Sequence, residues 1–462
     1  MNRNRAFHFL YFLILLLSTI LRINLAIVNR DANDDHLFVA RLIMQEKRLP
    51  GMNECWECFQ PKLFHYLLSI IFQILGIEIK DVEFQIILTQ LLNVFMGIVF
   101  ILIVWVFLNS LTFENELLKI MAFSLVAFNP DLIGINAQAT NDTLAILLGT
   151  LAIYAAWIFL KQERSIYLLA SIIFVSLGIT TKSNIFITAV GIQLALLVKA
   201  FTKKQRFIFF RAALFLPGVL VILFLNPISQ YLSNYRHFGS VVGMNMEEQP
   251  IPDLFEKSYV ARPGIVSIQD GFFTFKYVGL LEYPRLTNGF EGYPAHRTSL
   301  WTQIYARANS VHFANWPVSW GAKGNENFTL TRAIFIFALL PVAMLLIGAV
   351  ISLTDFLITL MRRSIDSLQI MDYGLFDVVF WSYVGFIILY SLKYRDFSVM
   401  KAIFIYPAML SFPLFFIKSG MAIRRVLMDQ KLFMTILSVV VTVLIILYSL
   451  DVYTLIVHLN SL

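Results

Sequence analysis

Long apolar stretches separated by short polar segments dominate this chain. The first runs from Ala6 to about Ile27, behind Met-Asn-Arg-Asn-Arg. It is too long for the apolar core of a signal peptide and no small-residue cleavage site follows it, so it predicts a first transmembrane helix. Ten further stretches predict membrane spans at about 84–108, 118–135, 142–160, 166–180, 183–199, 207–226, 333–353, 376–392, 402–417 and 432–456.

The basic residues predict which side of the membrane each connection occupies. With the N-terminus in the cytoplasm, the cytoplasmic segments are 1–6, 109–117, 161–165, 199–206, 354–375 and 418–431. These segments hold fourteen Lys and Arg, far more than the short loops of the opposite side, which include Lys182, Arg395 and Lys401. Because cytoplasmic loops carry the excess of Lys and Arg, this distribution predicts a cytoplasmic N-terminus.

Two long segments then fall on the outer side and suggest a division of the chain. We expect an N-terminal membrane module over 1–226 that includes a first outer loop at 28–82, a large outer loop at 227–332, and C-terminal membrane helices over 333–462. Within the first loop, the apolar residues after Asp35 and those between Leu63 and Ile77 are spaced as in helices that lie in the membrane interface. The second loop is rich in Pro, Gly and aromatic residues, which predicts a mixed outer domain.

Composition supports the same fold class. Hydrophobic residues make up 58% of the 462 positions and charged residues 14%, against about half and about a quarter in soluble domains. A soluble cytosolic enzyme, a disordered chain and a disulfide scaffold are therefore excluded. The net charge of +7 is explained by basic cytoplasmic loops, so it indicates no nucleic-acid partner. We predict an all-α polytopic membrane protein with about 11 transmembrane helices.

Acidic residues directly after the first span are the first candidates for chemistry. Asp31, Asp34 and Asp35, with His36, precede the first interface helix, where Asp and Asn commonly cap a helix. The alternative is a general base, because a carboxylate accepts the proton of a hydroxyl nucleophile. A divalent metal, if one takes part, would have Asp34, Asp35 and His36 as its candidate ligands.

Two further motifs lie on the outer side. Cys55 and Cys58 could form a local disulfide, a redox pair or half of a zinc site, and a structural disulfide or two reduced thiols is favoured over catalysis. Asn141-Asp142 opens a span, either as a helix cap or as a functional acid at the membrane edge.

The scarce outer cations form the last group of candidates. Lys182 breaks the positive-inside pattern, and either a lysine reaching for the interface or a phosphate partner explains it. Arg307, Arg395 and Lys401 belong either to a basic and aromatic interface belt or to a phosphate-binding site.

The order of these motifs resembles the GT-C glycosyltransferases, in particular the protein O-mannosyltransferase and aminoarabinose-transferase group. Asp34-Asp35-His36 resembles the acidic step of that group, although Asp35 stands where the group has Glu. Gln60-Pro61-Lys62-Leu63-Phe64-His65-Tyr66 resembles its Gln-Pro-Pro-Leu-Tyr-Tyr element, with Lys62 in place of a Pro. Asn141-Asp142-Thr143-Leu144 and the Gly178 to Lys182 helix end resemble further elements of the group.

The resemblance implies an activity and a set of roles. Such an enzyme transfers a hexosyl or pentosyl unit from a polyprenyl-phosphate donor to a hydroxyl of a glycan, lipid or protein on the extracytoplasmic face, with inversion. One of Asp31, Asp34 and Asp35 is then the general base. The donor phosphate is held by cations, for which the candidates are Lys182, Arg307, Arg395 and Lys401. Further site candidates are His36, Gln60, Lys62, Tyr66, Asn141 and Asp142. The protein is expected in the plasma or inner membrane if the source is prokaryotic.

Other functions remain open from the sequence. A transporter or flippase of a lipid-linked sugar would carry polar residues in mid-helix and related halves, and neither is prominent here. An enzyme like the O-antigen ligases would work on the same face with a pyrophosphate-linked donor. A non-catalytic membrane scaffold is the third alternative.

Overall fold

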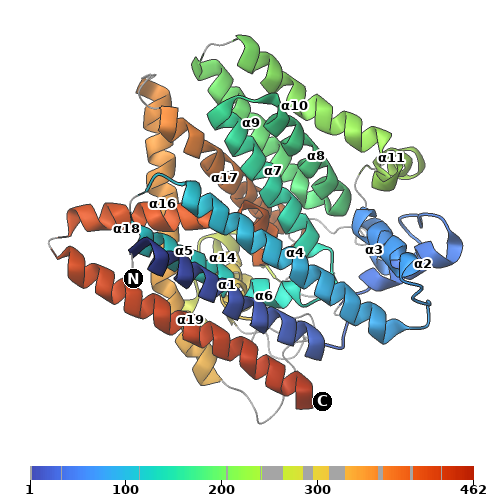
Figure 1. The fold of residues 1–462 in the computed structure, drawn as a ribbon, viewed down its shortest axis with the longest axis horizontal. Coiled ribbons are helices and arrows are strands. Elements are labelled where there is room, and N and C mark those ends of the chain that lie inside the picture. The colour runs from blue at the N-terminus through green and yellow to red at the C-terminus, as the bar shows by residue number, and fades with distance from the viewer. Residues whose placement is uncertain are drawn as a thin grey trace.

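The computed structural model is an all-α polytopic membrane protein (Figure 1). It describes residues 3–32, 34–113, 115–203, 206–239, 241, 264–284, 295–311, 328–362, 368–395, 399–427 and 429–461. Across these ranges every regular element is a helix. The prediction of an all-α membrane fold is therefore confirmed. The mixed domain expected at 227–332 lies partly outside the described residues. Two of its tryptophans, Trp316 and Trp320, fall in the part that is not described.

Eight helices in the described part of the chain are long and apolar enough to cross a membrane, and two bent pairs raise the number to ten. The eight are α1 (Arg3–Val28), α4 (Val82–Ser110), α7 (Asp142–Gln162), α9 (Phe186–Lys203), α10 (Arg206–Leu225), α16 (Phe328–Arg362), α17 (Leu368–Tyr394) and α19 (Gln430–Ser461). Helix α8 (Ser165–Thr181) is apolar but has only 17 residues. It accounts for the eleventh predicted stretch.

Two of the predicted spans are broken rather than straight. The stretch at 118–135 divides into α5 (Glu116–Ala127) and α6 (Pro130–Asn136), which are bent by 47°. Pro130 is the first residue of α6, where a backbone N–H has no partner within the helix, so proline, which lacks this N–H, fits well. The Asn129 side chain caps the helix by accepting a hydrogen bond from the Leu132 amide. These residues end one helix and start another inside an apolar run, which hydropathy alone does not reveal.

The second break separates the 3₁₀ helix η7 (Ala402–Ala408) from α18 (Ser411–Val426), with a bend of 79°. Pro407 lies inside η7 and Pro413 in the first turn of α18. Helix α18 continues to Val426, beyond the expected end of the span at 417, and includes Lys418. The Lys418 ammonium bonds to the Ser352 hydroxyl of α16 at 2.7 Å, which allows a charged side chain within the helix bundle.

Short helices fill the long connections of the expected outer side. The first connection forms α2 (His36–Glu46), the 3₁₀ helix η1 (Trp56–Phe59) and α3 (Leu63–Ile74), so both helices expected in this loop are present, and their place in the membrane interface stays a prediction. The segment after α10 forms η3 (Pro227–Ser229), α11 (Tyr231–Phe238), α12 (Ile268–Phe272), α13 (Tyr277–Glu282), η4 (Ala295–Thr298) and α14 (Leu300–Ala308). Helices α2, α3 and α11 lie together at one edge of the molecule (Figure 1).

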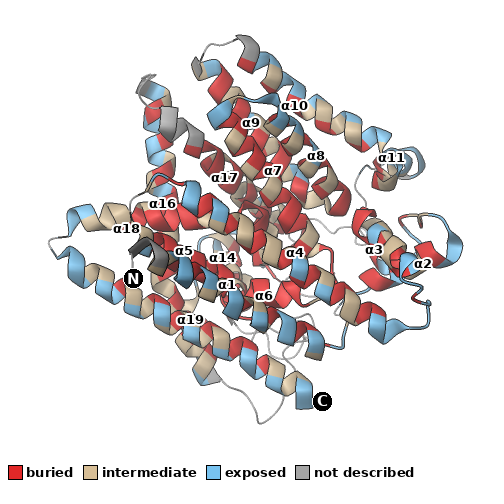
Figure 2. Ribbon diagram, viewed as in Figure 1, coloured by how far each residue is buried: buried red, intermediate tan, exposed pale blue. Residues whose placement is uncertain are grey.

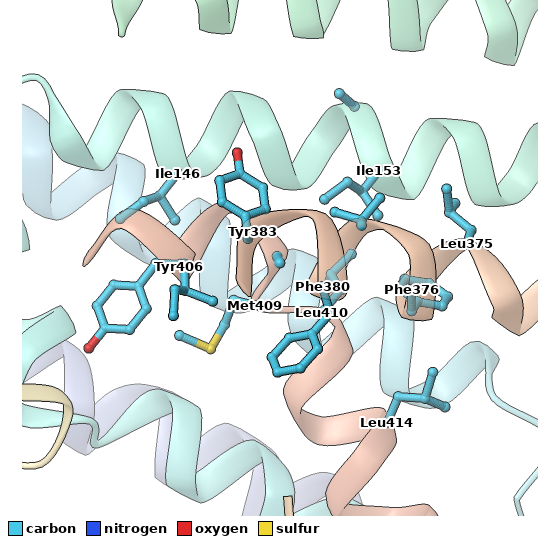
Figure 3. Packing of buried hydrophobic residues seen from close by; sticks show 14 of the residues in the cluster. Ile146, Ile153, Leu375, Phe376, Phe380, Tyr383, Tyr406, Met409, Leu410 and Leu414 are labelled. Carbon is cyan, nitrogen blue, oxygen red and sulfur yellow. The ribbon is translucent and has the colours of Figure 1, made fainter. Parts of the chain in front are cut away.

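The core is centred on α7. In its most apolar window 78% of the residues are buried, against 22% for α19 and 28% for α1 and α10 (Figure 2). The peripheral helices therefore present their apolar residues outward, as expected of helices that face lipid. Next to α7, side chains of α17, η7 and α18 interdigitate, among them Phe380, Tyr406 and Leu414 (Figure 3). Gly149 of α7 allows η7 to approach closely, since a Cβ there would lie 3.0 Å from Pro407 Cβ.

Candidate functional site

The candidate residues come from connections at one end of the bundle. Asp34 follows α1, Asp142 begins α7, Lys182 follows α8, Arg307 lies in α14, and Lys401 precedes η7. Since successive spans alternate in direction, these connections emerge on the same side. The structure joins segments that are up to about 370 positions apart in the sequence (34 to 401).

Asp34 is the acid that faces the other candidates. Its carboxylate accepts a hydrogen bond of 2.9 Å from the Asp35 amide and lies 3.7 Å from His36 Nε2. Burial alone would raise the pKa of Asp34, but His36, the Asp35 amide, Lys401 and Lys182 outweigh it and lower that pKa below its usual value. Its side chain is still 41% exposed, so this ionised carboxylate is accessible to a substrate.

Asp31 and Asp35 differ from Asp34 in their surroundings. Both are exposed. The Asp31 carbonyl accepts a hydrogen bond of 2.9 Å from Gln90 of α4, which anchors the backbone of the loop. Asp35 is the residue before α2 and its side chain makes no capping hydrogen bond, so the capping interpretation is wrong for Asp35.

Two buried histidines lie behind Asp34. His36 Nδ1 is 3.0 Å from His65 Nε2, and the two rings stack with centroids 5.2 Å apart. Burial lowers the pKa of His36 despite the opposing charge of Asp34, and burial also lowers the pKa of His65 well below its usual value. A hydrogen bond between two neutral imidazoles needs one donor and one acceptor nitrogen, so the pair joins the start of α2 to the start of α3.

Glu57 is a site residue that the sequence reasoning missed. It lies between the two cysteines, which form a disulfide, one of the two structural states favoured over catalysis from the sequence. Its side chain is buried, accepts a hydrogen bond of 2.5 Å from Gln60 Nε2 and is bonded to the side chain of Asp34. Burial, and then the charge of Asp34, raise the pKa of Glu57 to about 8, against smaller opposing effects of Lys182 and Gln60. The available sequence signal was an acidic residue between the two cysteines of the CxxC motif.

Gln60 and Asn141 connect this loop to the bundle. Asn141 Nδ2 donates to Gln60 Oε1 at 2.6 Å and to the Thr181 carbonyl, at the end of α8, at 3.1 Å. Asn141 makes no side-chain capping bond to α7, so the capping interpretation is wrong for Asn141 as well. The chain of contacts from Asp34 through Glu57 and Gln60 therefore ends at the residue before Asp142.

Three cations gather around these acids. The Lys182 ammonium pairs with the Asp142 carboxylate, so this lysine at the end of α8 has an acid partner at the start of α7. Lys401 lies within electrostatic range of Asp34, Lys182, Asp142 and Arg307. Burial and then Arg307 lower the pKa of Lys401, and Asp34 opposes them.

A second missed acid lies below the cations, where the two broken helix pairs meet. Asp131 of α6 is buried, accepts a hydrogen bond of 2.6 Å from the Tyr406 hydroxyl of η7, and is within electrostatic range of Arg307 and Lys401. Arg307 is itself buried. An acid directly after Asn129-Pro130 within an apolar stretch was the sequence signal for it.

Three predicted residues have other surroundings. Lys62 is buried and its ammonium donates to the carbonyls of Cys58 and Gln60, the latter at 2.9 Å, so it fixes the loop. Burial lowers the pKa of Lys62 to about 7. Tyr66 packs against the cluster of Val39, Ile43 and Cys58. Arg395 directly follows α17, and its carbonyl accepts a hydrogen bond of 3.0 Å from the Gly264 amide; its role in binding a phosphate stays a prediction.

The residues proposed as metal ligands do not form a metal-binding group. His36 uses Nδ1 toward His65, and Asp35 is exposed. Within the described ranges, no three His, Cys, Asp or Glu side chains are close enough together to hold an ion. The arrangement therefore offers an ionised carboxylate next to a protonated one, and cations at close range. These groups suit proton abstraction beside a bound anion.

No family model and no curated protein matches the sequence. Among solved structures, the chain is similar to the archaeal oligosaccharyltransferase AglB from Archaeoglobus fulgidus, determined in complex with an inhibitory peptide and a dolichol-phosphate. The identity is 13% and the TM-score 0.49, with 96% of this chain and 56% of AglB covered, so the chain spans little more than half of that protein. A likeness at this level defines neither family nor activity.

Proposed function

We propose that this chain is an integral-membrane glycosyltransferase that takes its sugar from a polyprenyl-phosphate donor at the outer face. In the reaction, the oxygen of an acceptor hydroxyl forms a bond to the anomeric carbon. The bond between that carbon and the phosphate oxygen breaks with inversion, and the polyprenyl phosphate leaves with the electron pair. The acceptor proton passes to the Asp34 carboxylate.

The observation that carries this proposal is the meeting of Asp34 with cations at one end of an apolar helix bundle. Asp34 is ionised and partly exposed, as a general base must be. Lys182 and Lys401 lie within electrostatic range of it, where they can stabilise the charge that develops on a leaving phosphate. A donor with a polyprenyl tail places its phosphate at such a membrane edge, because its tail partitions into the lipid.

Arg307 and Asp131 extend the cationic region away from Asp34. Arg307 acts on both Lys401 and Asp131, so the positive charge continues beneath the outer helix ends. A phosphate bound there lies between the bundle helices, while Asp34 remains on the water-exposed side. This separation suits a lipid-linked donor and an acceptor that arrives from water.

The first test compares two neighbouring carboxylates. Purified protein in lipid nanodiscs is assayed with polyprenyl-phosphate sugars as donors, as wild type, Asp34→Asn and Asp35→Asn. We expect Asp34→Asn to lower kcat by roughly 10²- to 10⁴-fold, because the general base is lost. Asp35→Asn is the matched control and should retain most of the activity. Full transfer by Asp34→Asn refutes the assignment of the base.

The same assay tests the cations and the alternatives. Lys401→Met should raise the donor KM by roughly 10- to 100-fold, as expected when a charged bond to phosphate is lost. Lys393→Met, which changes an exposed lysine of α17, is its control. Transfer from pyrophosphate-linked donors alone would favour a ligase-like enzyme, and uptake of the lipid-linked sugar into liposomes without transfer would favour a transporter.

A further inference from the structure

The loop between α2 and α3 is built to hold one side chain inward. The disulfide joins Cys55 to Cys58, and the Cys58 amide donates to the Cys55 carbonyl at 3.1 Å. Lys62 binds two carbonyls of the same turn from below. Within this closed turn, Trp56 is 58% exposed and Glu57 only 5%. Adjacent residues thus point in opposite directions, and Glu57 is the one directed into the protein.

The partners of Glu57 determine where its carboxyl group accepts a hydrogen bond and where it donates one. Gln60 Nε2 can only donate, so Glu57 Oε2 accepts this bond of 2.5 Å. Gln60 is fixed in that orientation because its Oε1 accepts from Asn141 at 2.6 Å. The remaining contact joins Glu57 to the side chain of Asp34. Two carboxyl groups bond to each other only when one carries a proton, and Asp34 is the ionised member.

Asp34 has few other restraints. It precedes α2 in an exposed loop, where its carboxylate accepts a bond from the neighbouring Asp35 amide and lies 3.7 Å from His36 Nε2. A contact from a disulfide-closed turn on a distant segment limits its rotation far more. Through Gln60 and Asn141, that contact also links Asp34 to the start of α7, where Asp142 pairs with Lys182.

We propose that Glu57 is a positioning residue, which donates a hydrogen bond to the Asp34 carboxylate and holds it in register with Lys182 and Lys401. This inference rests on the proposed function and adds to it a residue that acts through the general base. Together with the bond from the Asp35 amide, this contact fixes the orientation of the Asp34 carboxylate.

The kinetic test uses Glu57→Gln and Glu57→Ala, with Glu54→Gln as the control in the same loop. Glu54 is an exposed acid that pairs with Arg48, so its replacement should leave transfer unchanged. Glu57→Ala should lower kcat by roughly 10- to 100-fold with the donor KM unchanged, because a bond to a charged group is lost. Glu57→Gln should stay within about 3-fold of wild type, since its amide still donates to Asp34 and its oxygen still accepts from Gln60.

Two comparisons separate positioning from a folding defect. If Glu57 acts through Asp34, Glu57→Ala causes no further loss in the Asp34→Asn background, whereas a full additional loss overturns the proposal. Equal damage by Glu57→Gln and Glu57→Ala also overturns it, as does activity of Glu57→Ala within two-fold of wild type.

An infrared measurement tests the contact between Glu57 and Asp34 independently of glycosyl transfer. At pH 7 the infrared difference spectrum of wild type against Glu57→Gln should contain a protonated-carboxyl band, and Asp34→Asn should shift that band. Absence of the band refutes the proton-sharing contact even if glycosyl transfer is established. Presence of the band in a protein without transfer activity leaves the contact intact and refutes the proposed function alone.

Discussion

Three aspartates within five positions differ in their neighbours rather than in their own chemistry. The sequence placed Asp31, Asp34 and Asp35 together and could not rank them, because rank depends on residues contributed by other segments. Asp34 acquires His36, Lys182, Lys401 and Glu57 as neighbours, whereas Asp31 and Asp35 remain exposed. Lys182, Lys401 and Arg307 were recognisable from their unusual side, but Glu57 and Asp131 were hidden by a cysteine motif and an apolar run.

The pKa of Glu57 predicts an alkaline limit of activity. Below about pH 8 Glu57 is protonated and donates to Asp34, and as the pH rises through that value it ionises, loses the donor and repels the base. We therefore expect kcat of the wild type to fall as the pH rises through about 8. In Glu57→Gln, whose amide donates at every pH, kcat should not fall in this range. The same fall of kcat in both proteins would show that another group causes it.

The same shift affects stability with a defined sign. Because the folded pKa of Glu57 lies above its ordinary value of 4.5, the folded state keeps a proton that the unfolded chain has released. The stabilising contribution is full below 4.5 and is lost as the pH rises toward about 8. Thermal unfolding of Glu57→Gln should be less dependent on pH across this window than that of the wild type.

At the scale of elements, the break between α5 and α6 needs a polar partner within the bundle. Arg22 of α1 supplies it: Nη1 donates to the Ala127 carbonyl, at the end of α5, at 2.8 Å, and Nε donates to Asn136 Oδ1, at the end of α6, at 2.9 Å. One buried side chain thus satisfies both sides of the bend. Gly97 of α4 makes room for Asn136, since a Cβ there would lie 2.3 Å from Asn136 Oδ1.

Replacing Arg22 with Leu should destabilise the protein. The Ala127 carbonyl and the Asn136 oxygen would be left without their donor, at a cost of about 3 kcal/mol. A lowered midpoint of thermal unfolding in detergent measures this effect. Arg30→Gln removes an arginine that is 76% exposed and pairs with Glu83, so it should change stability by no more than about 0.5 kcal/mol. Equal midpoints for Arg22→Leu and wild type would contradict the role of Arg22.

Hydropathy predicted the existence of these helices well and their interruptions poorly. A long apolar run reports that a segment is surrounded by apolar groups, whether they are lipid or protein. The breaks at Asn129-Pro130 and near Pro407 depend on caps and on partners such as Arg22 and Tyr406, which come from distant segments. Their turn residues were visible in the sequence, but the bend they produce was not.

At the scale of the whole molecule, the alternation of helices places the site at one end. Helix positions and their order followed from the sequence, because each span reverses the chain. The sequence did not predict that the loop after α1 meets the end of α8 and the start of η7, because this meeting depends on packing around α7. Basic residues predict that this end faces away from the cytoplasm.

Sided labelling tests this orientation. The side chain of Lys80, in the connection between α3 and α4, is 78% exposed, and Arg425 at the far end of α18 is exposed. A membrane-impermeant maleimide should label Lys80→Cys in intact cells and Arg425→Cys only after permeabilisation. The native cysteines are joined in a disulfide and give no background. The reverse pattern of labelling would place the site in the cytoplasm.

The shortness of α8 has a consequence for the surrounding lipid. Its 17 residues rise about 25 Å, roughly one helical turn less than the hydrocarbon thickness of a typical bilayer. Hydrophobic mismatch of this kind is relieved by local thinning of the bilayer. We therefore expect the bilayer to be thinned beside α8, close to Lys182, which directly follows this helix. For the proposed polyprenyl-phosphate donor, such thinning would bring the phosphate closer to Lys182 and Lys401, so we expect capture of that donor to depend on membrane thickness.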